Sequence, residues 1–133
     1  MNDRLVLETS ALLDLVVGDA EGRAVREVLR NHQVHIVDHV AVAAARALQR
    51  LSEGGFLSTA ELNLRVRLLA TAPFTTHPAS ALLPAAARRT GLGIGDALSM
   101  ELSDRLAAPL LTTDSRLAST WPRSWLVASP KPA

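Results

Sequence analysis

The feature that most constrains this chain is a regular alternation of short β-type runs with longer helical stretches. The β-type runs cover residues 4–7, 34–37, 74–77, 109–112 and 125–128. Strands separated by helices are joined by right-handed crossovers, which place the strands parallel to one another. The alternation therefore predicts an α/β fold with a mostly parallel sheet of roughly five strands.

Cap and turn residues set the expected limits of the helices. Helices are expected at residues 10–17, 22–31, 38–51, 58–70, 78–90, 94–107 and 115–119. Ser10 and Asp38 are suited to cap the first and third of these, and Ser58 with Glu61 has the spacing of a capping box. Pro78 is suited to the first turn of the helix that follows it.

Length and composition fit one domain. The chain has 133 residues, 48% of them hydrophobic, which is enough for a core covered on both faces of a sheet. We expect this domain at residues 1–128 and a flexible tail at 129–133. The chain contains no cysteine, so disulfides and thiolate zinc ligands are excluded. It shows neither a signal-peptide pattern nor an apolar run of about 18–20 residues, so a cytoplasmic protein without a membrane segment is expected.

The basic residues are almost all arginines. Every one except Lys131 is arginine, yet the net charge is only +1. Arginine suits phosphate contacts, but a nearly neutral total argues against strong non-specific binding to nucleic acid. We therefore expect most arginines on solvated helix faces. Arg88 and Arg89 are open to two interpretations, contact with an RNA phosphate or a favourable interaction with a helix C-terminus.

Three carboxylates stand at predicted element ends that a parallel sheet brings together. Glu8 and Asp114 each follow a predicted strand, and Asp96 opens a helix. The carboxyl ends of parallel strands share one crevice, so we expect these acids to meet. Carboxylates bind Mg²⁺ or Mn²⁺, and such an ion activates water and stabilises charge on a phosphate. The pattern predicts a divalent-metal site for phosphodiester hydrolysis, in which Ser10 and Thr112 act as caps or hold a carboxylate or a metal-bound water.

The runs around these acids resemble the PIN-domain ribonucleases, and most closely the VapC-type toxins of bacterial toxin–antitoxin pairs. Residues 5–12 resemble the opening strand of the family, where Asp is followed one residue later by Ser or Thr. Residues 95–98 are similar to its Tyr-Asp-Ala helix start, and residues 108–117 to its final acidic motif. The resemblance implies a three-layer α/β/α PIN-like fold, Mg²⁺- or Mn²⁺-dependent RNA cleavage, and catalytic and metal-binding roles for Glu8, Asp96 and Asp114.

The same resemblance implies the partners. They are an RNA substrate, a VapB-type antitoxin that inhibits the toxin, and a second copy of the chain in a homodimer. Leu12, Leu13, Val16 and the helix at 58–70 offer apolar surface for a hydrophobic antitoxin segment, which we expect in a groove above the acidic site.

Three positions depart from the family pattern. Glu8 stands where the family has Asp, and its extra methylene moves the carboxylate by about 1.5 Å. The family's acid in the helix after the second strand falls near Ala43, and Asp38 lies too far around that helix to replace it. Gly95 replaces the family's Tyr. The departures leave open an alternative, a catalytically weakened or inactive PIN-like protein that acts as an RNA- or partner-binding dimer.

Simpler interpretations exist for single residues. Asp114 could only cap the helix that follows it, and Asp96 could only favour a helix dipole. The four histidines, His32, His35, His39 and His77, lie on several predicted elements, so we expect surface or partly buried roles rather than a zinc site.

The aromatic residues and the single lysine support two further predictions. Phe56 and Phe74 are expected in the core, and Trp121 and Trp125 at a sheet edge or a subunit contact. A phosphoacceptor receiver domain also gathers carboxylates at the end of a parallel sheet. It needs a lysine after its last strand, and Lys131 lies in the predicted tail, so this class is set aside.

Overall fold

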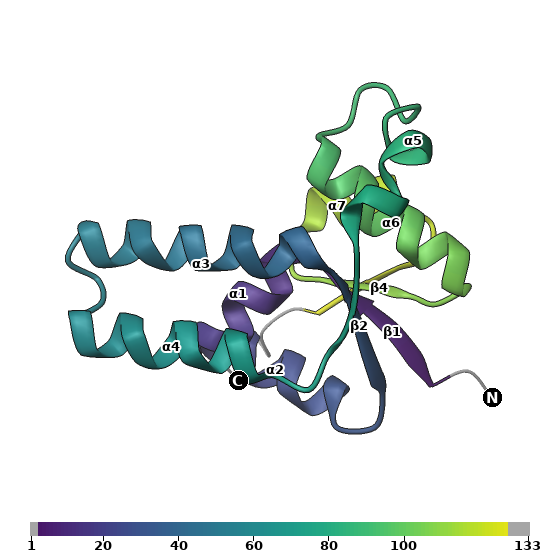
Figure 1. The fold of residues 1–133 in the computed structure, drawn as a ribbon. Coiled ribbons are helices and arrows are strands. Elements are labelled where there is room, and N and C mark those ends of the chain that lie inside the picture. Colours follow the sequence, from purple (N-terminus) through teal and green to yellow (C-terminus); the bar gives the residue numbers. More distant parts are fainter. Residues whose placement is uncertain (1–2, 128–133) are drawn as a thin grey trace.

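A five-stranded parallel sheet forms the centre of the computed structural model, which describes residues 3–127 (Figure 1). The strand order is β3-β2-β1-β4-β5, and every neighbouring pair is parallel. The strands are β1 (Arg4–Leu7), β2 (Gln33–Val37), β3 (Thr75–His77), β4 (Leu110–Thr112) and β5 (Ser124–Leu126). The predicted fold class is confirmed, whereas the predicted tail at 129–133 lies outside the described residues.

Helices cover both faces of the sheet and give the three α/β/α layers. They are α1 (Thr9–Val17), α2 (Ala20–Leu29), α3 (Asp38–Glu53), α4 (Thr59–Thr71), the 3₁₀ turn η1 (Ala79–Ala81), α5 (Leu83–Ala86), α6 (Ile94–Leu106) and α7 (Ser115–Thr120). Helices α1–α4 pack together on one side and α5–α7 on the other, and α3 and α4 form an antiparallel pair that extends beyond the sheet (Figure 1). Within residues 3–127, none of the helices is both long and apolar enough to cross a bilayer.

The central strands β1 and β4 are buried on both faces. Leu5, Val6 and Leu7 of β1 and Leu110 and Leu111 of β4 are all fully buried, although neighbouring side chains of a strand point to opposite faces. In sequence, such strands are continuous apolar runs rather than alternations of apolar and polar residues, because helices cover both faces of a parallel sheet. The carboxyl ends of these two strands therefore form a fixed platform for the acids that follow them.

Three helices have starts or caps that differ from the predicted ones. Glu8, not Ser10, caps α1, and Asp19 caps α2, which begins before Gly22. Gly22 allows a close approach of α1 and α2, because a Cβ there would lie 1.9 Å from the Asp14 carbonyl oxygen. Asp38 does not cap α3 but is its first residue, and its carboxylate accepts a hydrogen bond from Ala79 N at 3.0 Å. An acidic side chain near a helix start accepts hydrogen bonds from the free backbone N–H groups that the packing places within its reach.

Two further predictions were wrong. The expected helix at 78–90 is broken into η1, α5 and turns, because Pro84 has no N–H to continue a helix from η1 into α5. Phe56 is 78% exposed, since it lies in the turn between α3 and α4, at the far end of the extended pair (Figure 1). The Ser58–Glu61 capping box is confirmed, with both hydrogen bonds at 3.1 Å.

Candidate active site

Glu8 follows β1 and is 4% exposed. Its Oε1 accepts hydrogen bonds from Ser10 N at 2.9 Å and Ala11 N at 3.3 Å, which makes Glu8 the N-cap of α1. Carboxylates are stable at helix N-termini because the free N–H groups and the helix dipole favour negative charge. The predicted metal ligand is therefore also a structural cap.

Hydroxyl groups join Glu8 to β4. Thr112 is fully buried, and its Oγ1 donates to Glu8 Oε1 at 2.8 Å and accepts from Asp114 N at 3.0 Å. Ser10 Oγ also donates to Glu8 Oε1 and lies 3.3 Å from Thr112 Oγ1. Both predicted supporting residues thus hold the Glu8 carboxylate, and Thr112 also orients the backbone of Asp114.

The network extends to an acid that the sequence analysis missed. Thr113 Oγ1 lies 3.1 Å from Ser10 Oγ and donates to Asp14 Oδ2 at 2.6 Å. Burial, together with the nearby Asp19 and Glu21 carboxylates, raises the pKa of Asp14 to about 6, against the opposing hydrogen bond from Thr113. Asp14 is four residues after Ser10, so it lies on the same face of α1. That spacing was the signal that could have revealed it.

Asp96 and Asp114 form the second half of the acidic site. Asp96 lies in the first turn of α6, and Asp114 is the N-cap of α7, where its Oδ1 accepts from Arg116 N at 2.9 Å. Burial raises the pKa of Asp96, the charge of Asp114 raises it further, and Arg116 and His39 oppose the shift. A carboxylate whose charge is disfavoured by burial and by a neighbouring carboxylate is stabilised by a bound cation.

His39 is a further residue at this site. It is the second residue of α3, and its charge and that of Asp96 influence each other. Burial lowers the pKa of His39, while Asp38 and Asp96 oppose the shift. The sequence analysis predicted surface or partly buried roles for the histidines, because no local pattern places the start of α3 beside the start of α6.

The donor set is suited to a divalent cation. The carboxylates supply the oxygens that hard cations prefer, and the buried Nδ1 of His39 has no hydrogen-bond partner within residues 3–127. In the same described range, no three His, Asp or Glu side chains are already grouped closely enough to hold an ion. A Mg²⁺-type site can use one or two carboxylates and complete its shell with water. Asp96 and Asp114 are the pair that fits this description.

Position 43 carries no acid in the structure either. Ala43 is half-buried on α3 and lies one helical turn after His39, on the same face. The carboxylate of Asp38 is directed to Ala79 N instead. It remains a prediction that an acidic side chain at position 43 would face the site, as the resemblance to the family implies.

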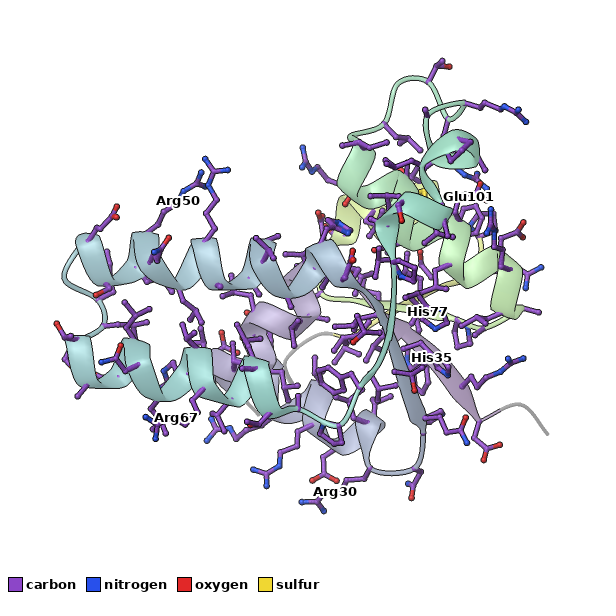
Figure 2. All side chains as sticks on the ribbon, in the orientation of Figure 1. Arg30, His35, Arg50, Arg67, His77 and Glu101 are labelled. Atoms are coloured by element: carbon purple, nitrogen blue, oxygen red, sulfur yellow. The ribbon has the colours of Figure 1, made fainter. Side chains whose placement is uncertain are left out.

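The two adjacent arginines have different surroundings. Arg89 forms an ion pair with Glu101 at 2.7 Å and lies over the Trp121 ring, 4.9 Å from its centroid. Trp121 itself donates to Ser103 Oγ at 3.1 Å, which ties α7 to α6. Arg89 is therefore engaged in the fold, whereas the Arg88 side chain is exposed. On the other side of the molecule, Arg50 and Arg67 point away from the α3–α4 pair into solvent (Figure 2).

Two of the four histidines meet outside the acidic site. His35 Nδ1 and His77 Nε2 are 2.8 Å apart, on the neighbouring strands β2 and β3 (Figure 2). His35 is 8% exposed, and burial lowers its pKa, followed by the charges of His77 and Arg4. The pair is held by parallel strand register, which the spacing in sequence does not reveal.

This pair makes the stability of the fold sensitive to acid. Because the pKa of His35 is lowered from 6.5 on folding, the unfolded chain binds a proton first as the pH falls. The free energy of unfolding is therefore expected to decrease as the pH drops below about 6.5 and to level off below the folded pKa. Urea unfolding at several pH values measures this slope. Because the raised pKa of Asp14 acts in the opposite sense, the comparison is with His35→Gln, and an equal slope in the variant would contradict the assignment.

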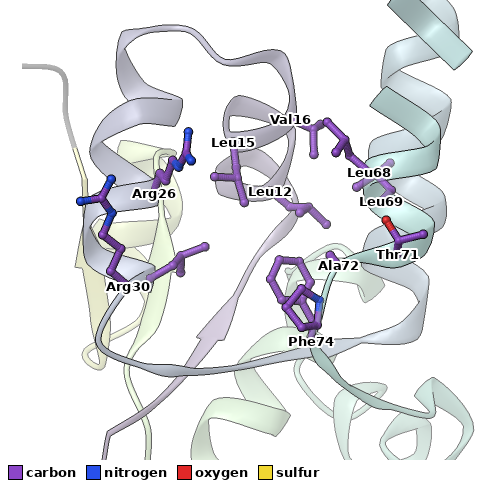
Figure 3. A pocket seen from close by; sticks show the side chains of 12 residues that line it. Leu12, Leu15, Val16, Arg26, Arg30, Leu68, Leu69, Thr71, Ala72 and Phe74 are labelled. Atoms are coloured by element: carbon purple, nitrogen blue, oxygen red, sulfur yellow. The ribbon is translucent and has the colours of Figure 1, made fainter. Parts of the chain in front are cut away.

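An apolar cavity of about 690 Å³ lies between α1, α2 and α4. Leu12 and Leu15 face Leu68 and Leu69 across it, and Arg26 and Arg30 stand on a further side (Figure 3). Phe74, just before β3, also lines the cavity, so it lies near the amino ends of the strands. Glu8 and Asp114, by contrast, follow the carboxyl ends of β1 and β4. An apolar groove is therefore present, but it does not lie above the acidic site as predicted. Leu12 and Val16 are mostly buried.

The family model for the PIN domain matches residues 5–120, a span that includes Glu8, Asp96 and Asp114. This match covers most of the chain and agrees with the parallel sheet and its acidic edge. The chain belongs to the PIN-domain family.

Its relatives include the VapC proteins. The chain is 35% identical over 122 residues to Ribonuclease VapC3 of Mycobacterium tuberculosis, in strain CDC 1551 / Oshkosh and in strain ATCC 25618 / H37Rv. Each alignment covers 90% of this chain and 89% of the relative. The crystal structure of PAE2754 from Pyrobaculum aerophilum matches with a TM-score of 0.66 and 19% identity, over 92% of this chain and 82% of that one. The predicted VapC-type relationship is confirmed, and the structural match supports the fold.

Proposed function

We propose that this protein is a divalent-metal-dependent RNA endonuclease of the VapC type, acting in the cytoplasm and inhibited by a cognate antitoxin. The observation that carries the proposal is the placement of Asp96 in the first turn of α6 and of Asp114 at the N-cap of α7, beside the sheet end where Glu8 caps α1. The relatives named Ribonuclease VapC3 support the reaction class and the single-domain organisation of residues 1–128.

Asp96 and Asp114, with Glu8, would hold Mg²⁺ or Mn²⁺, which supplies an activated water and stabilises charge on the scissile phosphate. Thr112 keeps the Asp114 backbone and the Glu8 carboxylate in fixed positions. Arg116, whose side chain is 93% exposed beside Asp114, is suited to bind a neighbouring RNA phosphate. The chain thus positions the phosphodiester and the acids relative to each other.

The rival proposal is a weakened or inactive PIN-like protein that binds RNA or a partner. Glu8 Oε1 already accepts several hydrogen bonds, and position 43 has no acid, which favours this rival. An RNA-cleavage assay with Mg²⁺ or Mn²⁺ and an EDTA control separates the two. Cleavage that EDTA stops supports the endonuclease, and RNA or antitoxin binding without cleavage supports the rival.

Restoring the family's acids is expected to strengthen the site. The double variant Ala43→Glu with Glu8→Asp should bind Mn²⁺ at least about tenfold more tightly and cleave RNA faster, because each change moves a carboxylate to the family's position. Each single change should do less, since ligands of one ion are coupled. Calorimetry and a cleavage assay measure both effects.

A matched control separates this gain from a general effect of charge. Ala45→Glu adds the same side chain to α3 on a different face, beside Val42 and Arg46. It should leave Mn²⁺ affinity unchanged. A folded double variant with the parent's affinity and cleavage would show that position 43 does not face the site.

We further propose that a VapB-type antitoxin places an apolar segment in the cavity between α1, α2 and α4. Apolar side chains line most of this cavity, and Arg26 and Arg30 favour acidic residues that flank the segment. On helix α4, Leu68 lines the cavity and is 48% exposed, so its apolar side chain is available to a partner. The proposed homodimer has a separate apolar surface, which includes Val42 and Val66.

Leu68→Glu is expected to weaken antitoxin binding at least about 30-fold, because it places a charge in the apolar cavity. Leu68 is 48% exposed, so the fold should remain intact. Leu64→Glu is the control, since Leu64 is 56% exposed on the same helix and does not line the cavity. Calorimetry with the product of the adjacent reading frame measures the affinities, and equal losses in both variants would place the antitoxin elsewhere.

A further inference from the structure

Two hydroxyl groups connect Asp14 on α1 to Glu8 at the end of β1. Thr113 Oγ1 donates a hydrogen bond to Asp14 Oδ2 at 2.6 Å and lies 3.1 Å from Ser10 Oγ. Ser10 Oγ in turn donates to Glu8 Oε1. Thr113 N also donates to Ser10 Oγ at 3.3 Å, which holds the two hydroxyls next to each other. The Asp14 carboxylate is therefore linked to the Glu8 carboxylate by a chain of side-chain hydrogen bonds.

The protonation of Asp14 decides in which direction this chain runs, because each hydroxyl has only one hydrogen to donate. When Asp14 is ionised, Thr113 donates to it and Ser10 donates to Glu8, so no hydrogen lies between the two hydroxyl oxygens. When Asp14 takes up a proton, its O–H donates to Thr113 Oγ1. The Thr113 hydroxyl then rotates to donate to Ser10, which still donates to Glu8. Every link of the chain then contains a hydrogen, and no heavy atom has to move.

The surroundings of Asp14 bring this change close to neutral pH. Burial, with the Asp19 and Glu21 carboxylates, raises the pKa of Asp14 to about 6, against the hydrogen bond from Thr113. Both carboxylates come from the start of α2, which packs directly on Asp14. A Cβ on Gly22 would lie 1.9 Å from the Asp14 carbonyl oxygen. Asp14 therefore changes its charge in a range where an ordinary aspartate is already ionised.

The other elements that pack on α1 contribute different groups. From α4, Arg65 donates to the carbonyl oxygen of Val16, in the last turn of α1. Helix α3 packs on α1 as well, and its buried side chains are all apolar, namely Val40, Ala44 and Leu48. The hydrogen-bond donor that reaches the Asp14 carboxylate is the Thr113 hydroxyl, from the turn after β4. A change in the charge of Asp14 is therefore transmitted to Thr113.

We propose that Asp14 is a positioning residue of the acidic site, whose protonation sets how firmly hydrogen bonds hold the Glu8 carboxylate. The effect passes through the Thr113 and Ser10 hydroxyls, and its consequence for metal binding rests on the proposed function. Hydrogen bonds in a chain strengthen one another, so a Ser10 hydroxyl that accepts from Thr113 is a better donor to Glu8. Ionisation of Asp14 removes that support. The Glu8 carboxylate then becomes more available to a cation as the pH rises through about 6.

NMR of the metal-free full chain between about pH 4.5 and pH 8 tests the proposal. The Ser10 amide donates to Glu8 Oε1, so its chemical shift reports the hydrogen bonding of that carboxylate. In the parent, this shift should change in a step at about pH 6, where the carboxyl carbon of Asp14 titrates. The step should disappear in Asp14→Asn. It should also disappear in Thr113→Val, although the Asp14 carbon still titrates there, at a higher pH because a hydrogen bond that lowers its pKa is lost.

Two controls separate the chain of hydroxyls from other causes. Thr113→Ser keeps a hydroxyl at this position and should restore the step. Asp104→Asn makes the same change as Asp14→Asn at a residue that is 53% exposed and paired with Arg123, so it should leave the step unchanged. A step that persists in Asp14→Asn would show that another group causes it. One that persists in Thr113→Val would show that the charge acts through space. Either result, or a parent without a step, would overturn the proposal.

Calorimetry with Mn²⁺ below and above the pKa of Asp14 measures the consequence for the site. Between about pH 5 and pH 7, the affinity of the parent should rise at least about fivefold more than that of Asp14→Asn. Thr113→Val should behave like Asp14→Asn, although it keeps the acid. Asp96 titrates in all three proteins, so its contribution cancels. Equal rises in the three proteins would overturn the effect on the site. If Asp96→Asn binds Mn²⁺ as tightly as the parent, the proposed metal site is wrong, and the NMR result still decides the role of Asp14.

Discussion

Asp96→Asn is expected to lower RNA cleavage at least about 100-fold and to weaken Mn²⁺ binding strongly, because it removes a charged oxygen ligand from the proposed site. Single-turnover cleavage with saturating RNA measures the first effect and calorimetry the second. Asparagine keeps the size of the side chain, so α6 should retain its structure.

A stability measurement distinguishes loss of a ligand from loss of the fold. Without metal, Asp96→Asn should be at least as stable as the parent, because burial and the charge of Asp114 both disfavour ionised Asp96. Saturating Mn²⁺ at 100 times its Kd should stabilise the parent by about 2.7 kcal/mol and the variant by much less. Asp104→Asn, on the same helix and 53% exposed, is the control. Equal Mn²⁺ stabilisation of all three proteins would contradict the assignment of Asp96.

Thr112→Val is expected to reduce the free energy of unfolding by about 2–4 kcal/mol. The hydroxyl of Thr112 donates to the Glu8 carboxylate and accepts from Asp114 N, and the residue is fully buried, so water cannot replace either bond. A hydrogen bond to a charged group contributes about 1.5–3 kcal/mol and a neutral one about 1 kcal/mol. Valine has nearly the shape of threonine, so the change isolates the hydroxyl. Urea unfolding at pH 7 measures it.

Two variants test the reason for that loss. Thr112→Ser keeps the hydroxyl and removes one methyl group, so it should lose only about 1 kcal/mol. Thr76→Val, at an exposed position on β3, should change stability by less than about 0.5 kcal/mol. If Thr112→Ser and Thr112→Val lose equal stability, packing rather than the hydrogen bonds to Glu8 and Asp114 holds this part of the site together.

Much of the fold depends on local patterns, and the sequence was sufficient to predict it. The β-type runs marked the five strands to within a few residues. The central strands β1 and β4 were the clearest, because strands covered on both faces are continuous apolar runs. The Ser58–Glu61 capping box was predictable because its two hydrogen bonds join residues three positions apart. The parallel direction of the strands was predictable from the alternation of strands and helices. The acidic motifs, read in order, identified the PIN family that the comparisons show.

The sequence by itself thus determined the class of fold, the family and the carboxylates that a metal would need. Only the tertiary structure decided what each of these side chains contacts. Thr112 donates to Glu8 across 104 positions of sequence, His39 packs on Gly95, and the His35–His77 pair depends on the register of β2 and β3. The physical reason is that helix caps and turns are set by neighbours along the chain, whereas side-chain partners depend on packing between elements that the sequence does not order in space.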